Sequence, residues 1–237
     1  MTALARVTLT PKTPKTEIAL SGMTAALDLT GALLLPDEGA LLVADLHLEK
    51  GSSFARRGQF LPPYDTRETL AALADVVARL APRLVVALGD SFHDVGGPDR
   101  LSPEDAAALA ALQQGRTWIW VTGNHDRELP ASIGGEVVAE MALGALTLRH
   151  EPRAGATSEV AGHLHPVGKV NMRGRSVRRR CFATDGSRLV MPAFGAYTGG
   201  LNVCDPAFGP IFPGSFTAHL IGDARIFTIN RAMLCRD

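Results

Sequence analysis

The spacing of apolar residues in the first half of the chain alternates between two periods. Three short apolar runs that end in polar residues predict buried strands at 41–44, 84–88 and 118–121. Apolar positions three and four residues apart predict a helix over 66–81. A second helix is predicted from the N-cap Ser102 to about Gly115. Strands that alternate with helices and are apolar throughout favour a mostly parallel sheet in an α/β fold.

The pattern changes after residue 135. Short strands are predicted at 145–150, 159–162, 176–184, 188–192 and 223–230, with glycine and proline between them. We expect them to form antiparallel or mixed pairs in a second sheet on the same core. Residues 1–15 are polar, with lysines between prolines, and are expected to be a flexible lead-in. Residues 16–237 are then expected to form one domain.

Composition excludes several classes of protein. The 237 residues are 46% hydrophobic, which suits a globular chain with a sizeable core. Neither a membrane-spanning run nor a signal peptide is evident, so a cytoplasmic protein without a membrane partner is expected. Three widely spaced cysteines support neither a disulfide framework nor a zinc ribbon. The net charge is zero, so only a local basic patch could attract nucleic acid.

Imidazole and carboxylate side chains gather where the predicted strands end. Only His219 lies elsewhere; the other six histidines lie at or just after strand ends: His47, His93, His125, His150, His163 and His165. Ligand sites in α/β sheets collect in the loops beyond the carboxyl ends of strands. Asp45 and His47 are two positions apart, as are His163 and His165, and such side chains point the same way in an extended segment. We therefore expect these side chains to converge.

The convergent set offers too many donors for one metal ion. Its seven members are Asp45, His47, Asp90, Asn124, His150, His163 and His165. Seven donors suit two ions about 3.5–4 Å apart, as in two-metal hydrolytic sites. Imidazole nitrogen and carboxylate or amide oxygen, without thiolate, favour Mn²⁺, with Fe or Zn²⁺ as alternatives. A single Asp-x-His pair is more often a turn or a surface pair, but the ordered set at successive strand ends favours a metal site.

The ordered motifs resemble those of the calcineurin-like metallophosphoesterases. They are Asp45-Leu-His47, Gly89-Asp90 with Asp94, Gly123-Asn-His-Asp126, His150 and Gly162-His-Leu-His165. The resemblance implies an α/β (α+β) fold, a four-layer αββα sandwich of two packed mixed β-sheets flanked by helices. It also implies a dinuclear centre in which a water between the ions attacks phosphorus.

The resemblance further implies a role for each residue. One ion would bind Asp45, His47 and His165, the other Asn124, His150 and His163, and Asp90 would bridge both. His125 would act as the general acid that protonates the leaving oxygen. Asp94 and Asp126 would orient His125 or tune its charge. The role of His93 stays open between substrate contact, support of the site and plain structure.

Three further segments are similar to the ligase-associated DNA-damage-response endonucleases of bacteria. They span 45–51, 88–94 and 192–200. This resemblance implies a DNA endonuclease linked to DNA repair, with a DNA ligase or helicase as partner. A phosphodiesterase or phosphatase for a small nucleotide or phosphorylated metabolite is the alternative. A non-catalytic scaffold is disfavoured because the whole candidate ligand set is present.

Basic residues near the motifs are candidates for contact with a DNA backbone. The segment 169–188 is rich in arginine and includes Arg178, Arg179 and Arg180; Lys50, Arg56 and Arg57 follow the first motif. A solvated basic hairpin is the plain alternative. The apolar stretch 192–216 could line the site or form the surface of a homo-oligomer.

Overall fold

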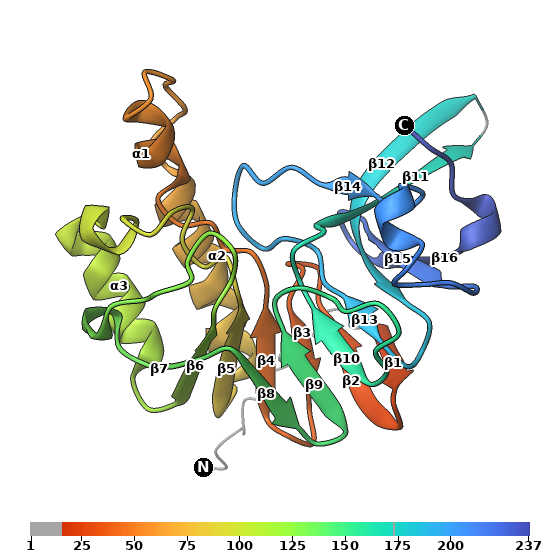
Figure 1. Ribbon diagram of the computed structural model, residues 1–237, viewed down its shortest axis with the longest axis horizontal. Coiled ribbons are helices and arrows are strands. Elements are labelled where there is room, and N and C mark those ends of the chain that lie inside the picture. Colours follow the sequence, from red (N-terminus) through yellow and green to blue (C-terminus); the bar gives the residue numbers. More distant parts are fainter. Residues whose placement is uncertain (1–15, 173) are drawn as a thin grey trace, which may run out of the picture.

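Two β-sheets with helices on the outside make up the computed structural model, which describes residues 16–172 and 174–237 (Figure 1). The expected α/β fold of two mixed sheets with flanking helices is confirmed. The expected flexible lead-in, residues 1–15, lies outside the described residues, as does Arg173.

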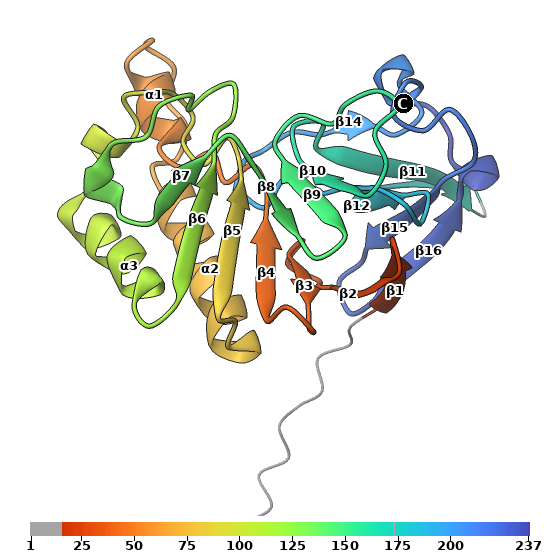
Figure 2. The same ribbon diagram turned by 60° about the horizontal axis from the view of Figure 1, so that its bottom comes forward.

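The first sheet joins an antiparallel half to a parallel half. Its seven strands follow one another in chain order: β1 (Thr16–Leu20), β2 (Met23–Leu27), β3 (Leu33–Leu35), β4 (Ala40–Val43), β5 (Leu84–Leu88), β6 (Thr117–Val121) and β7 (Glu136–Val138). Pairing is antiparallel from β1 to β4 and parallel from β4 to β7. Figure 2 shows β4, β5 and β6 side by side, pointing towards the end of the sheet where α1 (Lys50–Ala55) lies. β4, β5 and β6 correspond to the predicted strands, whereas β1, β2, β3 and β7 were not predicted.

The second sheet is mixed throughout. Its main path runs β14-β11-β12-β13-β10-β9-β8, and β15 and β16 extend from β12. The strands are β8 (Glu140–Leu143), β9 (Leu146–Arg149), β10 (Glu159–Ala161), β11 (Pro166–Met172), β12 (Arg175–Thr184), β13 (Leu189–Val190), β14 (Leu201–Asn202), β15 (Thr217–Ile221) and β16 (Ile226–Asn230). β9 and β10 are parallel to each other. The expectation of antiparallel or mixed pairing after residue 135 is confirmed, although β8, β11, β14 and β15 were not predicted.

Two longer helices and several single turns complete the secondary structure. The two helices are α2 (Asp65–Leu80) and α3 (Pro103–Gln113). The hydroxyl of Ser102 accepts a hydrogen bond from the amide of Asp105 at 3.1 Å, which confirms the predicted N-cap of α3. Four 3-10 turns occupy Pro98–Arg100, Ala131–Ile133, Pro206–Phe208 and Arg231–Met233. None of the helices in the described ranges has both the length and the apolar character needed to cross a bilayer.

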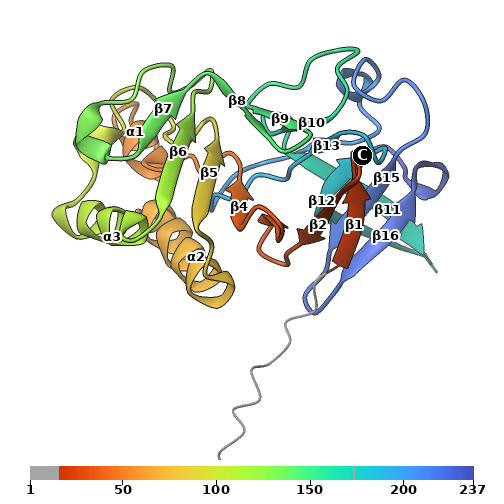
Figure 3. The same cartoon turned by 90° about the horizontal axis from the view of Figure 1, so that it is seen from below.

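Alternate residues of the parallel strands pack against two different layers. Leu42 and Val86 face the second sheet and form the core between the sheets. Leu41 and Val85 face the other way and pack against α2 and α3. In Figure 3, α2 and α3 lie on one side of β4 to β6, while β9 and β10 lie on the other. The carboxyl ends of β4 to β6 in the first sheet and of β9 and β10 in the second lie at the same edge of the two sheets.

A loop segment covers the outer face of the second sheet. Phe208, Ile211, Phe212 and Phe216 are buried there against β12 and β15. This part of the stretch 192–216 therefore fills the chain's own core and is not a free apolar surface. The preceding residues contact the candidate site, because the amide of Gly195 donates to the carbonyl of Asp45.

Candidate metal centre

The candidate residues follow five strand ends, three in the first sheet and two in the second. Asp45 and His47 follow β4, and Asp90 follows β5. Asn124 follows β6, His150 directly follows β9, and His163 and His165 follow β10. All seven predicted positions lie at one edge of the two sheets.

The backbone of these residues differs from the extended segment that was expected. Asp45, His47, Asp90, His163 and His165 all have positive φ, between 45° and 69°. Their side chains therefore converge because of left-handed turns and not because of strand alternation. Neighbouring loops hold the turns in place: the amide of Asp45 donates to the carbonyl of Gly89, and the amide of His47 donates to that of Asp90. Such conformations are costly for residues with a side chain and cluster at functional sites.

One group of possible metal ligands joins Asp45, His47 and His165. The Nε2 atoms of His47 and His165 are 3.4 Å apart. The Oδ1 atom of Asp45 lies 3.2 Å from Nε2 of His165. Asp45 is fully buried, and its carboxylate also accepts the amide hydrogen of His163. The first sheet thus supplies two side chains of this group and the second sheet one.

The second group consists of Asp90, His150 and His163. Nε2 of His150 lies 3.3 Å from Oδ2 of Asp90 and 3.2 Å from Nδ1 of His163. The Oδ1 atom of Asn124 is 3.0 Å from the same nitrogen. The other ring nitrogen of His150, Nδ1, donates to the carbonyl of Leu88 at 2.9 Å, so Nε2 is the nitrogen that faces the group.

Asp90 lies between the two groups. Its Oδ2 atom is 4.0 Å from Nε2 of His47 and 3.3 Å from Nε2 of His150. Its Oδ1 atom accepts the amide hydrogen of His125 at 2.9 Å. One carboxylate therefore reaches both groups and also fixes the start of the loop that carries His125.

The charge distribution fits a site for cations. Burial, with help from His165 and His125, lowers the pKa of His47 to about 3 despite the charge of Asp90. Burial alone would lower the pKa of His150, but its hydrogen bond to Asp90 and the charges of Asp45 and Asp90 raise it to about 9. Burial would raise the pKa of Asp90, but its contacts with His150 hold that pKa at about 2.

Divalent metal ions fit these residues. Around Nε2 of His150 the lone pairs of a carboxylate, an amide oxygen and a second imidazole converge within 3.3 Å. Lone pairs repel one another at such distances unless a positive charge lies among them. Without a metal, the proton of His150 supplies that charge; two divalent cations would supply it to both groups. Imidazole and oxygen donors without thiolate suit Mn²⁺, Fe or Zn²⁺.

The ring of His125 lies beside the two groups and is oriented by a backbone carbonyl. Its Nδ1 donates to the carbonyl of His93 at 2.9 Å, and its Nε2 lies 3.9 Å from Oδ2 of Asp90. The ring of His93 stacks on it, with centroids 5.3 Å apart. His125 is 41% exposed in its side chain, so its Nε2 atom is accessible to a substrate.

The two carboxylates expected to orient His125 bond to other groups in the structure. Asp94 forms a bidentate ion pair with Arg100, at 2.9 Å for both bonds. Burial would raise the pKa of Asp94, but this pair outweighs it and lowers the pKa to about 2. Asp126 is buried, and its carboxylate accepts four backbone amides, those of Asp90, Ser91, Phe92 and Gly123. Burial raises the pKa of Asp126 to about 6.

The predicted substrate-contact residues are divided between two regions. Arg56 and Arg57 are exposed at the end of α1, and Lys50 donates to the carbonyl of Tyr197 at 2.9 Å. Arg178, Arg179 and Arg180 lie on β12 in the second sheet. The basic segment ends earlier than expected, because Arg188 is buried in an ion pair with Glu159.

One basic residue next to the centre was not predicted. Arg127 is exposed and lines a pocket of about 290 Å³ together with Asn124 and His150. Its position directly after Gly123-Asn-His-Asp126 was the only signal in the sequence.

Known proteins resemble this chain in sequence and in fold. Residues 40–177 match the family model of the calcineurin-like phosphoesterases. Among solved structures, the nuclease MPE of Pseudomonas putida superposes with a TM-score of 0.70 at 29% identity, over 91% of this chain and 100% of that one. The phosphoesterase Yfce of E. coli reaches a TM-score of 0.40 at 15% identity, over 82% of this chain and 98% of that one. No match was found among curated proteins.

The matched region spans more than half of the chain and contains every candidate ligand from Asp45 to His165. Two groups of possible metal ligands meet within it, with the carboxylate of Asp90 between them. Family members act on phosphoesters with two metal ions, which is the chemistry that these donors suit. The chain therefore belongs to the calcineurin-like phosphoesterase family and is a metal-dependent phosphoesterase.

Proposed function

We propose that this phosphoesterase is a DNA endonuclease that cuts internal phosphodiester bonds and acts in DNA repair. The observation that carries the proposal is the pair of metal-ligand groups joined by Asp90 in a chain that aligns over nearly its whole length with a nuclease. Exposed basic side chains on α1 and β12 give a DNA backbone cations to contact.

The assignment of ligands follows the two groups. Asp45, His47 and His165 would hold one ion. Asn124, His150 and His163 would hold the other, and Asp90 would bridge both. We assign Mn²⁺ as the metal, with Fe or Zn²⁺ as alternatives set by the same donors. When bound, two such ions lower the pKa of water and neutralise charge on the phosphoryl oxygens.

His125 is proposed as the general acid. The carbonyl of His93 accepts a hydrogen bond from Nδ1, so Nε2 is the atom that would carry a proton to the leaving oxygen. Oδ2 of Asp90 lies 3.9 Å from this Nε2 atom, on the side of the ring that faces the two ligand groups. Asp126 acts at one remove, because its carboxylate fixes the backbone that presents Asp90.

The proposed DNA contacts are the cations Lys50, Arg56, Arg57, Arg178, Arg179 and Arg180. The proposal extends to a DNA ligase or helicase as partner in the cell, on the strength of the resemblance of 45–51, 88–94 and 192–200 to ligase-associated endonucleases. Co-purification of the tagged chain with such an enzyme tests that extension.

Covalently closed single-stranded circular DNA tests the endonuclease directly. A circle has no ends, so linear product requires an internal cut. We expect wild-type protein with Mn²⁺ to linearise the circle, and neither EDTA-treated protein nor Asp90→Asn to do so. Hydrolysis of a small chromogenic diester by the same samples controls for a competent centre. Intact circles beside rapid hydrolysis of the diester would overturn the DNA proposal and direct the search to nucleotides and small phosphoesters.

A further inference from the structure

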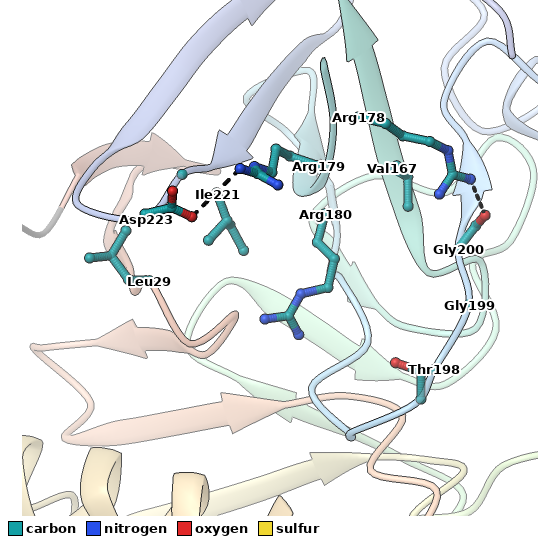
Figure 4. Close-up of a pocket in the computed structure, with 11 residues that line it drawn as sticks. Leu29, Val167, Arg178, Arg179, Arg180, Thr198, Gly199, Gly200, Ile221 and Asp223 are labelled. Carbon is teal, nitrogen blue, oxygen red and sulfur yellow. Dashed lines mark hydrogen bonds and ion pairs between the residues drawn. The ribbon is translucent and has the colours of Figure 1, made fainter. Parts of the chain in front are cut away.

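A basic pocket lies on the second sheet next to the candidate centre. It has a volume of about 500 Å³ and is bordered by β12, by the loop 198–200 and by the end of β15 (Figure 4). Three consecutive arginines, Arg178, Arg179 and Arg180, line it, whereas the described pocket wall contains one acid, Asp223. The side chains of the wall therefore leave an excess of positive charge.

Two of the three arginines already have acidic partners. Arg178 pairs with Asp237 at 3.1 Å and donates to the carbonyl of Gly200 at 2.8 Å. Arg179 pairs with Asp223 at 3.6 Å. In Figure 4, Arg178 turns towards Gly200 and Arg179 towards Asp223. Neither needs a ligand to satisfy its charge.

Arg180 differs from both neighbours. It is half-buried, and its only hydrogen bond in the described parts of the chain runs from Nη1 to the carbonyl of Ala193 at 2.7 Å. No carboxylate there lies within ion-pair distance, and burial lowers the pKa of Arg180. The guanidinium projects into the pocket in Figure 4. A partly buried cation without an anion nearby is unfavourable, so an anionic ligand would stabilise the guanidinium of Arg180.

The opposite wall supplies backbone donors. The amides of Gly199 and Gly200 have no hydrogen-bond partner among the residues described. A Cβ added at Gly199 would meet no atom within 4 Å, so a ligand can approach this backbone closely. Guanidinium and free amide groups together form the usual protein environment of a phosphate.

The pocket borders the candidate centre without sharing a ligand with it. The amide of Leu201 donates to the carbonyl of His165 at 3.1 Å. Val167, in the pocket wall, is two residues from His165. A strand whose scissile bond lies at the centre can therefore continue into the pocket.

We propose that this pocket is a phosphate subsite, centred on Arg180, for a nucleotide of the substrate strand beyond the bond that is cut. This inference rests on the proposed nuclease function and deepens it. The pocket volume exceeds that of one phosphate, so it also accommodates the attached sugar. Arg180 and the amides of Gly199 and Gly200 donate to the phosphate oxygens, and Arg178 and Arg179 hold the walls through their own ion pairs.

Arg180→Gln tests the subsite in kinetics. We expect KM for a single-stranded oligonucleotide to rise about tenfold, and the slope of log KM against log salt to fall by about one, because one phosphate contact is lost. Turnover of a small chromogenic diester, which cannot reach the pocket, should stay within about twofold. Arg67→Gln, which removes an exposed charge on α2 paired with Asp105, is the matched control. It should change neither KM for the oligonucleotide nor turnover of the diester. Equal losses on both substrates would overturn the subsite, because Arg180 would then act only by holding Ala193. Unchanged KM for the oligonucleotide would overturn it as well.

Binding to protein stripped of metal with EDTA separates this inference from the nuclease proposal. Oligonucleotide and inorganic phosphate are each titrated into wild type, Arg180→Gln and Arg180→Lys. Loss of oligonucleotide binding in Arg180→Gln, with recovery in Arg180→Lys, supports the subsite even if the wild type cuts no DNA. If binding of inorganic phosphate depends on Arg180 and binding of the oligonucleotide does not, the pocket is a site for free phosphate and the strand assignment is overturned. If neither ligand depends on Arg180 for binding, both the strand assignment and the free-phosphate assignment are overturned.

Discussion

The carboxylate of Asp90 faces three imidazole rings, those of His47, His125 and His150, at 3.3 to 4.0 Å. Asp90→Asn keeps the Oδ1 acceptor for the amide of His125, so the fold should survive. The variant loses the charge that both ligand groups share. We expect both metals to bind more weakly and turnover of a small diester to fall on the order of 100-fold or more.

Metal content, circular dichroism and diester hydrolysis check this expectation on one sample. A folded Asp90→Asn protein with wild-type turnover would remove Asp90 from its proposed place between the ions.

The general-acid role proposed for His125 predicts a dependence on the leaving group. His125→Ala should slow DNA cleavage by about 10²–10⁴-fold, the range for loss of a general acid. A nitrophenolate leaves without a proton, so the same variant should retain most of its turnover of a nitrophenyl diester. The two rates of one preparation control for each other. Equal losses on both substrates would contradict the general-acid role.

Sequence reasoning at the residue scale could locate side chains but not their backbone conformation. All seven candidate ligands were found because each follows an apolar run. The left-handed φ values of Asp45 and His47 leave no pattern in the sequence, since aspartate and histidine occur in most conformations. The four amides bound by Asp126 come from two separate loops, and only the folded chain brings them together.

Prediction of elements succeeded where apolar runs are long and buried. β4, β5, β6 and α2 match the predicted ranges within a few residues. β1 and β2 were not predicted because each is a five-residue segment in which polar residues interrupt the apolar ones. The Ser21-Gly22 pair between them, with φ of 47° and 80°, was the available hairpin signal. β15 was not predicted, although it forms a local hairpin with β16, because Thr217 and His219 interrupt its apolar residues.

An ion pair between elements anchors α2 to the first sheet. Arg79, near the end of α2, binds the buried carboxylate of Asp28 through two bonds of 2.8 and 3.0 Å. Asp28→Asn should reduce the free energy of unfolding by about 2 kcal/mol at pH 7. Asp75→Asn is the matched control: Asp75 is exposed and 3.9 Å from the same arginine, so the change should stay below about 0.5 kcal/mol. Equal effects would contradict the anchoring role.

The same pair predicts a pH dependence. Burial would raise the pKa of Asp28, but the bonds from Arg79 and Thr30 outweigh it and lower that pKa below 3.8. The pair's contribution is therefore complete above the unfolded pKa of about 4 and is lost as pH falls through the lower folded pKa. In urea titrations, the difference between wild type and Asp28→Asn should shrink below about pH 4. A difference that is constant down to pH 2 would contradict this linkage.

At the scale of the whole molecule, each ligand group draws side chains from both sheets. Asp45 and His47 come from the first sheet and His165 from the second, and Asp90 likewise faces His150 and His163. Bound ions should therefore hold the sheets together. Mn²⁺ at about 100 times its Kd should add about 2.7 kcal/mol of stability. For a chain of this size, that corresponds to a rise in Tm of roughly 5–10 °C.

Thermal unfolding with Mn²⁺ and with EDTA measures the effect, and Asp90→Asn should show a smaller rise. Identical Tm values for wild type in the two conditions would show that the ions do not link the sheets.

The left-handed turns at the candidate centre bring the candidate ligands together but lower the stability of the folded chain. Five of the ten non-glycine residues with positive φ among the described residues are candidate ligands. Each such residue costs on the order of 1 kcal/mol relative to glycine. At His165, which is only partly buried, glycine should therefore give a more stable protein than alanine. Homologues that no longer hydrolyse phosphoesters should therefore tolerate glycine at these turns, and such substitutions should raise the thermal stability of the protein while they remove its activity.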